Sequence, residues 1–108
     1  MGKYRSRFDI IVDVLKAVSE KGLKKTNIMH RANLSYKLLT RYLKDVMDMD
    51  LVRVEDGNIY EITEKGSNLL REVNGYRERR VEVEEQLSEI KDVKVMLENR
   101  FLNAEDSS

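Results

Sequence analysis

The chain begins with an apolar repeat that is typical of an amphipathic helix. Between Arg7 and Val18, apolar side chains recur every three or four positions, at Phe8, Ile11, Val12, Leu15 and Val18. We expect Ser6 to cap the start of this helix and Gly22 to end it. The residues that follow, from Leu23 to Lys25, are expected to form a short extended link.

Two shorter helices separated by a tight turn are predicted next. Thr26 is a suitable N-cap for a helix over residues 27–31, and Ser35 for a helix over residues 36–47. Asn33 between them suits the left-handed conformation that closes a helix. The residues of this segment that are expected to face the core are Ile28, Met29, Ala32 and Leu34. This order of elements is that of a helix-turn-helix.

The third predicted helix has two faces of opposite character. One face is an apolar stripe of Leu39, Leu43 and Val46. The other face carries basic and hydroxyl side chains, at Tyr36, Lys37, Thr40, Arg41 and Lys44. Such a helix can be anchored in a core by its apolar face while its polar face enters the major groove of DNA.

A β-hairpin and the start of a last helix follow. The strand-like runs cover residues 51–54 and 58–62, and the Asp56-Gly57 pair between them favours a two-residue turn. Thr63 is expected to cap the last helix. Gly66, in the first turn of that helix, is expected to permit close packing.

The last predicted helix is long and carries a coiled-coil pattern. From Thr63 to Phe101 the chain has no proline and only two glycines, Gly66 and Gly75. At ~1.5 Å per residue the helix would be about 57 Å long, too long to pack on so small a domain. Apolar residues alternate at spacings of four and three, interrupted by Arg80 and Lys94, which predicts a dimer seam. The predicted dimer-interface residues are Val73, Tyr76, Arg80, Val83, Leu87, Ile90, Lys94, Leu97 and Phe101.

The orientation of this coiled coil stays open between parallel and antiparallel. Each orientation aligns some flanking ion pairs, which contribute only a few tenths of a kcal/mol each. An antiparallel pair with Leu87 opposite Ile90 also brings Tyr76 opposite Phe101 and uses the full apolar length of the helix. The fuller apolar overlap favours the antiparallel pair.

Charge divides the chain into two halves, although its net charge is zero, with 20 basic and 20 acidic side chains. Residues 1–54 carry 12 basic and 6 acidic side chains, for a net charge of +6. Residues 55–108 carry 8 basic and 14 acidic side chains, for a net charge of −6. A basic half indicates contact with a polyanion, and the acidic half indicates a different role.

Composition argues against a catalytic or metal site and against a membrane span. The chain has one histidine, His30, and no cysteine, so neither a transition-metal centre nor a Cys/His or Ser/His/Asp catalytic set is expected. No apolar stretch reaches the ~18 residues that a membrane span needs. We therefore expect no enzymatic activity, no cofactor and a cytoplasmic protein, which would be associated with the nucleoid if it binds DNA.

The elements together predict a winged helix-turn-helix domain that binds DNA. The expected DNA contacts are Lys24, Lys25, Ser35, Tyr36, Lys37, Thr40, Arg41, Lys44, Arg53 and Asn58. A basic fringe of Lys3, Arg5 and Arg7 would add phosphate contacts. The wing tip, Glu55-Asp56, is acidic and would repel phosphate, so we do not expect the wing to insert deeply into a groove.

Several motifs resemble those of small archaeal winged-helix DNA-binding proteins. They are residues 28–36 (IMHRANLSY), Tyr42-Leu43, Leu51-Val52 and residues 60–66 (YEITEKG). The likeness is to the ten-kilodalton Sulfolobus chromatin-protein family and to archaellum-regulator-like winged-helix factors, over roughly residues 6–102. The resemblance implies double-stranded DNA as the ligand, contact through the helix from Ser35 to Met47, an antiparallel coiled-coil dimer and no enzymatic activity.

We therefore predict a mostly α fold with a small β-hairpin. A winged-helix domain at residues 1–72 is followed by a dimerisation helix at 73–104 and a disordered tail at 105–108. The expected function is a homodimeric regulator of transcription that binds double-stranded DNA. The neutral net charge favours such a regulator over a non-specific chromatin protein. A protein-interaction adaptor, in which the winged helix is only a scaffold, is the alternative from another class.

Overall fold

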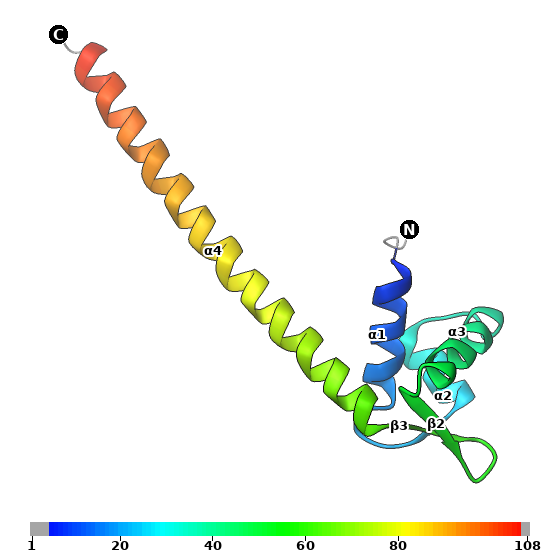
Figure 1. Cartoon of the computed structure of the whole chain (residues 1–108). Coiled ribbons are helices and arrows are strands. Elements are labelled where there is room, and N and C mark those ends of the chain that lie inside the picture. The colour runs from blue at the N-terminus through cyan, green and yellow to red at the C-terminus, as the bar shows by residue number, and fades with distance from the viewer. Residues whose placement is uncertain (1–4, 107–108) are drawn as a thin grey trace. The chain divides into compact units, whose positions relative to one another are not determined.

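The computed structural model describes the backbone of residues 5–106 and the side chains of residues 5–102. It forms two compact units, Met1–Glu72 and Val73–Ser108. The elements in chain order are α1 (Arg7–Ala17), β1 (Leu23–Lys24), α2 (Lys25–Ala32), α3 (Tyr36–Asp48), β2 (Val52–Glu55), β3 (Ile59–Ile62) and α4 (Glu64–Asp106) (Figure 1). This is the predicted mostly α fold, with a winged-helix domain and a long C-terminal helix.

The sheet has one more strand than the predicted hairpin. Strands β2 and β3 pair antiparallel, with Val52 opposite Ile62 and Glu55 opposite Ile59. Strand β1 pairs with the other edge of β3, which gives three strands in the order β1-β3-β2. The link expected after Gly22 is therefore a strand, too short for an alternating pattern to reveal it. The turn between Glu55 and Ile59 holds Asn58 as well as the predicted Asp56-Gly57 pair.

Helix α1 starts as predicted and ends earlier. The Ser6 side chain accepts a hydrogen bond from the Asp9 amide at 3.1 Å, and the Asp9 carboxylate accepts one from the Ser6 amide at 3.3 Å. The helix ends at Ala17, so the expectation that Gly22 ends it is wrong. A Cβ at Gly22 would lie 2.7 Å from a side-chain carbon of Ile59. Glycine at this position therefore permits the approach of β1 to β3.

Three of the other predicted caps are confirmed and one is wrong. Helix α2 begins at Lys25 without a side-chain cap, so Thr26 lies inside it and does not cap it. Asn33 closes α2 in the left-handed conformation, at φ 54° and ψ 55°. Ser35 Oγ accepts a hydrogen bond from the Leu38 amide at 3.2 Å. Thr63 Oγ1 accepts one from the Gly66 amide at 3.0 Å.

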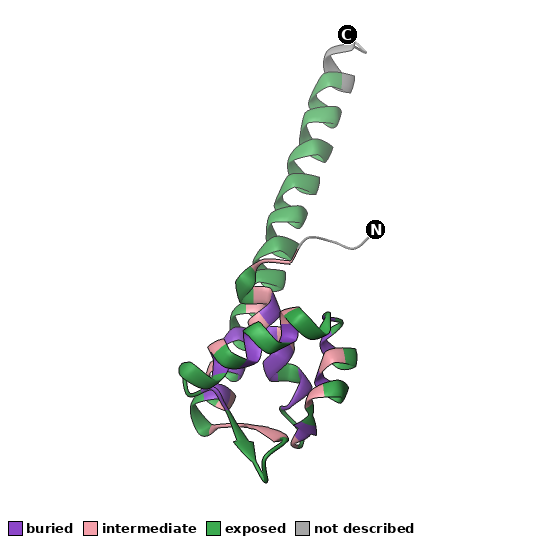
Figure 2. Cartoon of the chain, turned by 90° about the vertical axis from the view of Figure 1, so that its right-hand side faces the viewer, coloured by how far each residue is buried: buried purple, intermediate pink, exposed green. Residues whose placement is uncertain are grey.

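The core of the first unit lies between α1, α2, α3, the sheet and the first turns of α4 (Figure 2). Its fully buried side chains include Val12, Val14, Leu15, Val18, Ile28, Leu39, Val46 and Val52. Three residues assigned to inward faces differ from the expectation. Phe8 is 50% exposed, and Ile11 and Met29 are only half-buried. The buried face of α1 is centred instead on Val14 and Leu15.

The second unit is the continuous helical part of α4 from Val73 onwards. The helix passes the predicted end at Phe101 and continues to Asp106, so positions 105 and 106 of the predicted tail are helical. Ser107 and Ser108, the rest of that tail, lie outside the described residues. Gly75 does not interrupt the helix. Every residue from 78 to 102 is exposed in the single chain.

Candidate nucleic-acid interface

Helix α3 has the two predicted faces. On one face Leu39, Leu43 and Val46 are buried, and Tyr42 joins them at 7% exposure. The basic and hydroxyl residues of the other face are all exposed; they are Tyr36, Lys37, Thr40, Arg41 and Lys44. The apolar face therefore fixes α3 to the core, and the polar face is accessible to a ligand along its length.

The three cations on this face differ in their intramolecular partners. Lys44 Nζ lies 3.4 Å from Asp48 Oδ2, one helical turn further on. Lys37 and Arg41 have no ion pair or hydrogen bond with any other described side chain. Both border an open groove at the start of α3, together with Ser35 and the half-buried Leu38. Lys37 and Arg41 are thus the cations of α3 most available to an outside anion.

The other polar groups at the start of α3 are already engaged. Ser35 Oγ caps the helix, and Thr40 Oγ1 donates to the Tyr36 carbonyl at 2.8 Å. Lys25 Nζ lies over the Tyr36 ring, 4.1 Å from its centroid, within the range of a cation–π interaction. Ser35 therefore has a structural role here, whether or not it also contacts a ligand. Leu38 is a groove residue that the sequence analysis did not single out.

The wing carries its cation between two carboxylates. Arg53 Nε lies 3.1 Å from Glu55 Oε1, and Arg53 Nη2 lies 3.3 Å from Glu61 Oε2. Asp56 and Asn58 at the turn are exposed. A phosphate at Arg53 would have to compete with both carboxylates. Lys24 lies exposed on β1, on the opposite edge of the sheet from β2.

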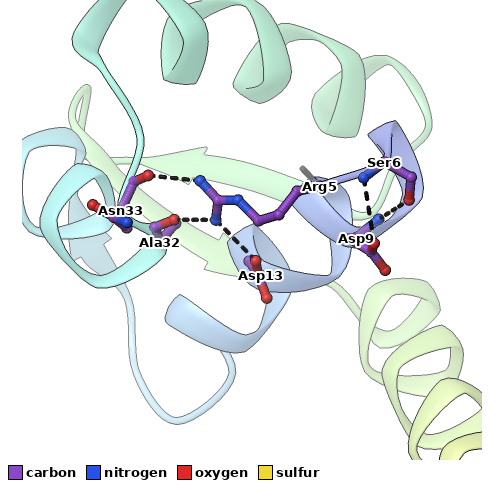
Figure 3. Close-up of polar contacts among 6 residues, drawn as sticks. All are labelled: Arg5, Ser6, Asp9, Asp13, Ala32 and Asn33. Atoms are coloured by element: carbon purple, nitrogen blue, oxygen red, sulfur yellow. Dashed lines mark hydrogen bonds and ion pairs between the residues drawn. The ribbon is translucent and has the colours of Figure 1, made fainter. Parts of the chain in front are cut away.

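The basic fringe near the N-terminus is largely paired within the protein. Arg5 bonds to Asp13 and to two backbone carbonyls, and Arg7 lies 3.4 Å from Asp45 (Figure 3 shows the Arg5 contacts). Lys3 lies outside the described residues. The hydrogen bonds of Arg5 are directed at protein acceptors, and the expected phosphate contact of Arg5 stays a prediction.

Among the side chains that the structure describes, those of residues 5–102, no three His, Cys, Asp or Glu group as metal ligands. None of the helices within residues 5–106 combines the length and apolarity that crossing a membrane requires.

Comparisons with known proteins identify the class to which this site belongs. Residues 4–81 match the model of the winged helix-turn-helix family, and the chain belongs to that family. Among curated proteins it is similar to an uncharacterized protein of Methanocaldococcus jannaschii, with 42% identity over 69 residues, or 64% of this chain. The chain spans about a third of that relative's length, since the match covers 32% of it.

Solved structures include two similar archaeal proteins. One is Sso10a-2, a DNA-binding protein from Sulfolobus solfataricus, with TM-score 0.58 and 26% identity over 80% of this chain and 96% of that one. The other is the transcriptional regulator BldR from the same organism, with TM-score 0.59 and 28% identity over 87% of this chain and 72% of that one. ZitR of Lactococcus lactis, 19% identical at TM-score 0.58 over 81% of this chain and 64% of its own, shares the fold. The predicted resemblance to archaeal winged-helix proteins is confirmed, and the fold is that of winged-helix DNA-binding regulators.

Proposed function

We propose that this chain binds double-stranded DNA as a homodimeric regulator of transcription, with α3 as its recognition helix. The observation that carries the proposal is the pair of exposed, unpaired cations Lys37 and Arg41 on a helix whose other face is buried. A guanidinium on such a helix can donate two hydrogen bonds to the O6 and N7 atoms of guanine. The DNA-binding protein and the regulator to which the chain is similar favour the same ligand.

The remaining predicted contacts divide by their accessibility. Lys24 and Lys37 are exposed and suited to phosphates, which supply most of the affinity and fix the register on the duplex. Lys25 and Tyr36 would act as a stacked pair beside the start of α3. Lys44 and Arg53 are paired with carboxylates, so we assign them a smaller share of the binding free energy.

A sequence-preferring regulator fits the charge better than a protein that coats DNA. The net charge is zero, and the tip of the wing is acidic. Non-specific binding comes almost entirely from the neutralisation of phosphates by Lys and Arg. Because only two cations of α3, Lys37 and Arg41, are unpaired, we expect modest affinity for DNA of arbitrary sequence. Contacts to base edges should then supply a larger share of the binding free energy. We assign the protein no enzymatic activity.

We propose that the second unit joins two copies through the predicted seam. Six apolar seam residues are about half exposed or more in the single chain; they are Tyr76, Val83, Leu87, Ile90, Leu97 and Phe101. A helix with such a stripe is stabilised when a second copy covers it. Val73 is already buried at 6% exposure, so the part of the seam that a partner can cover begins at Tyr76.

The two seam cations favour an antiparallel pair. In a parallel coiled coil, equal positions face each other, so Arg80 would face Arg80 of the second copy, and Lys94 would face Lys94. Such like-charge contacts are costly at an interface. With Leu87 opposite Ile90 in an antiparallel pair, Arg80 faces Leu97 of the second copy instead. Within the chain, Arg80 pairs with Glu84 at 3.1 Å, which keeps its charge compensated.

Sedimentation with and without duplex DNA tests both parts of this proposal at once. The protein alone is expected to sediment as a dimer and to shift when a pool of mixed-sequence duplexes is added at low salt. In a salt series, the logarithm of the binding constant should fall linearly with the logarithm of the salt concentration. The slope of that line reports the number of phosphates contacted. No shift with any duplex at low salt would rule out the DNA-binding function.

Arg41→Ala is expected to weaken binding to a preferred duplex by roughly 1–3 kcal/mol, because it removes a base contact. Lys16→Ala, which removes the same charge from the exposed surface of α1, is the matched control and should change binding far less. Lys44→Ala should fall between them, because Lys44 is paired with Asp48. Fluorescence anisotropy on duplexes selected from a random pool measures all three. Equal affinities for Arg41→Ala and Lys16→Ala would exclude base contact by Arg41.

A protein-interaction adaptor is the second candidate, favoured by one observation. Apolar side chains outside the seam are also exposed on α4, namely Val81, Val93, Val95, Met96 and Leu102. They lie in the half of the chain with a net charge of −6. A chain that binds no DNA at low salt but co-purifies with one defined protein would select this function instead.

A further inference from the structure

Arg5 connects three segments of the winged-helix unit that are distant in sequence (Figure 3). Its Nη1 donates to Asp13 Oδ2 on α1 at 3.0 Å and to the carbonyl of Ala32 at 2.7 Å. Its Nη2 donates to the carbonyl of Asn33 at 2.6 Å. The planar guanidinium suits this task, because its donors point in fixed directions and can hold several acceptors at once.

The two carbonyls that Arg5 binds lie where α2 passes into the turn before α3, since Ala32 is the last residue of α2 and Asn33 is its C-cap. The last carbonyls of a helix have no partner within the helix and carry its negative end charge. The amides of this turn are already bonded, Asn33 to the His30 carbonyl at 3.3 Å and Leu34 to the Met29 carbonyl at 3.0 Å. Arg5 therefore completes the hydrogen bonding of the turn from the carbonyl side, and links it to α1.

Both ends of this connection are fixed. On one side, Ser6 follows Arg5 directly and is held by its reciprocal hydrogen bonds with Asp9 at the start of α1 (Figure 3). On the other side, Asn33 is separated only by the buried Leu34 from Ser35, which caps α3. A displacement of the turn would therefore move the first two turns of α3, where Lys37 and Arg41 border the groove.

We propose that Arg5 is a positioning residue for DNA binding: it fixes the start of α3 relative to α1 and does not itself contact DNA. The proposal rests on the proposed function of α3. This role replaces the expected phosphate contact, because the charge of Arg5 faces Asp13 and its N–H donors face two backbone carbonyls. Binding should then depend on Arg5 through geometry and not through counterion release.

Arg5→Ala and Arg7→Ala form a matched pair for the test. Each removes one arginine from the start of the domain, but Arg7 reaches α3 only in its last turn, through an exposed 3.4 Å contact to Asp45, and has no contact with the turn before α3. At a temperature where both variants are folded, Arg5→Ala is expected to bind mixed-sequence duplex about tenfold more weakly than Arg7→Ala. The salt slope of Arg5→Ala should equal that of the wild type, whereas a lost phosphate contact would lower it by about 0.9.

Amide hydrogen exchange without DNA supplies a readout that mere destabilisation would not give. Arg5→Ala should exchange faster at the amides of Leu34, in the turn, and Leu38, in the first turn of α3, while Val14 and Leu15 in the core keep their protection.

Asp13→Asn, which leaves the two carbonyl bonds in place, should cause an intermediate loss of affinity, about threefold. If Arg5→Ala does not fold, Asp13→Asn decides, and wild-type affinity of that variant overturns the proposal.

The remaining outcomes separate this inference from the function on which it rests. Equal affinity of Arg5→Ala and Arg7→Ala, or a reduced salt slope of Arg5→Ala, overturns the positioning role while DNA binding by α3 stands. Uniformly faster exchange across the domain would also overturn it, because the effect would then be global. A wild-type chain that binds no duplex at low salt overturns the proposed function, and the positioning role with it.

Discussion

Replacing Gly66 by alanine is expected to lower the free energy of unfolding by roughly 3 kcal/mol. A Cβ at this position would overlap the carbonyl oxygen of Leu51 and come within 2.8 Å of Ile62 Cγ1. The Leu51 carbonyl cannot easily move, because it accepts the Thr63 amide at 3.0 Å, next to the start of α4. The clash therefore meets fixed backbone and not the end of a flexible side chain. Urea denaturation followed by circular dichroism measures the loss.

Gly75→Ala in the same helix is the control for this prediction. Apart from the neighbouring residues and the backbone of the helix itself, no described atom lies within 4 Å of a Cβ built there, so only the helix propensity changes. That change should stabilise the helix by about 0.5–1 kcal/mol. If the free energy of unfolding falls for Gly66→Ala and rises for Gly75→Ala, close packing, and not the helix propensity of alanine, determines the effect at Gly66. A Gly66→Ala protein as stable as the wild type would contradict the packing seen around Leu51.

Leu87→Glu is expected to raise the dimer dissociation constant by at least about 100-fold, roughly 3 kcal/mol. Leu87 is half exposed in the single chain and lies at the centre of the proposed seam. Each dimer would lose two buried leucines and would bring a carboxylate into the apolar centre from each copy. Sedimentation equilibrium over a range of concentrations measures the constant. The winged-helix unit should keep its fold, because residue 87 lies outside it.

Val95→Glu is the control for the seam. Val95 is 55% exposed but lies off the four–three repeat, so the same carboxylate should leave the dimer intact. Should Val95→Glu dissociate the dimer while Leu87→Glu does not, the predicted seam is on the wrong face of the helix.

Single cysteines can determine the orientation of the two helices, because the chain has no cysteine of its own. In the antiparallel pair, Arg80→Cys alone should not form a disulfide on oxidation. A mixture of Arg80→Cys and Leu97→Cys should form a mixed disulfide, since these positions face each other. Cross-linking of Arg80→Cys with itself would indicate a parallel pair.

Much of the candidate site could be predicted from local sequence. The burial of Leu39 and the exposure of Arg41 both follow from the helical repeat, and Ser35 is recognisable as a cap from its position before the repeat. The availability of each cation could be predicted only where its partner lies in the same helix. Lys44 pairs with Asp48 within one turn, whereas Arg53 meets Glu61 only because β2 and β3 pair in a particular register.

The sequence by itself determined the helices, the hairpin and most of the caps, because these depend on contacts between residues three or four apart or across one turn. Only the tertiary structure decided that Leu23 and Lys24 join the sheet, since their partners in β3 are more than thirty residues away in the chain. It likewise decided that Arg5, whose residue type alone suggested a phosphate contact, binds the turn at Ala32 and Asn33. The role of Arg5 is set by acceptors that folding brings to it from a segment 27 and 28 residues away, and no local pattern in the sequence could reveal them.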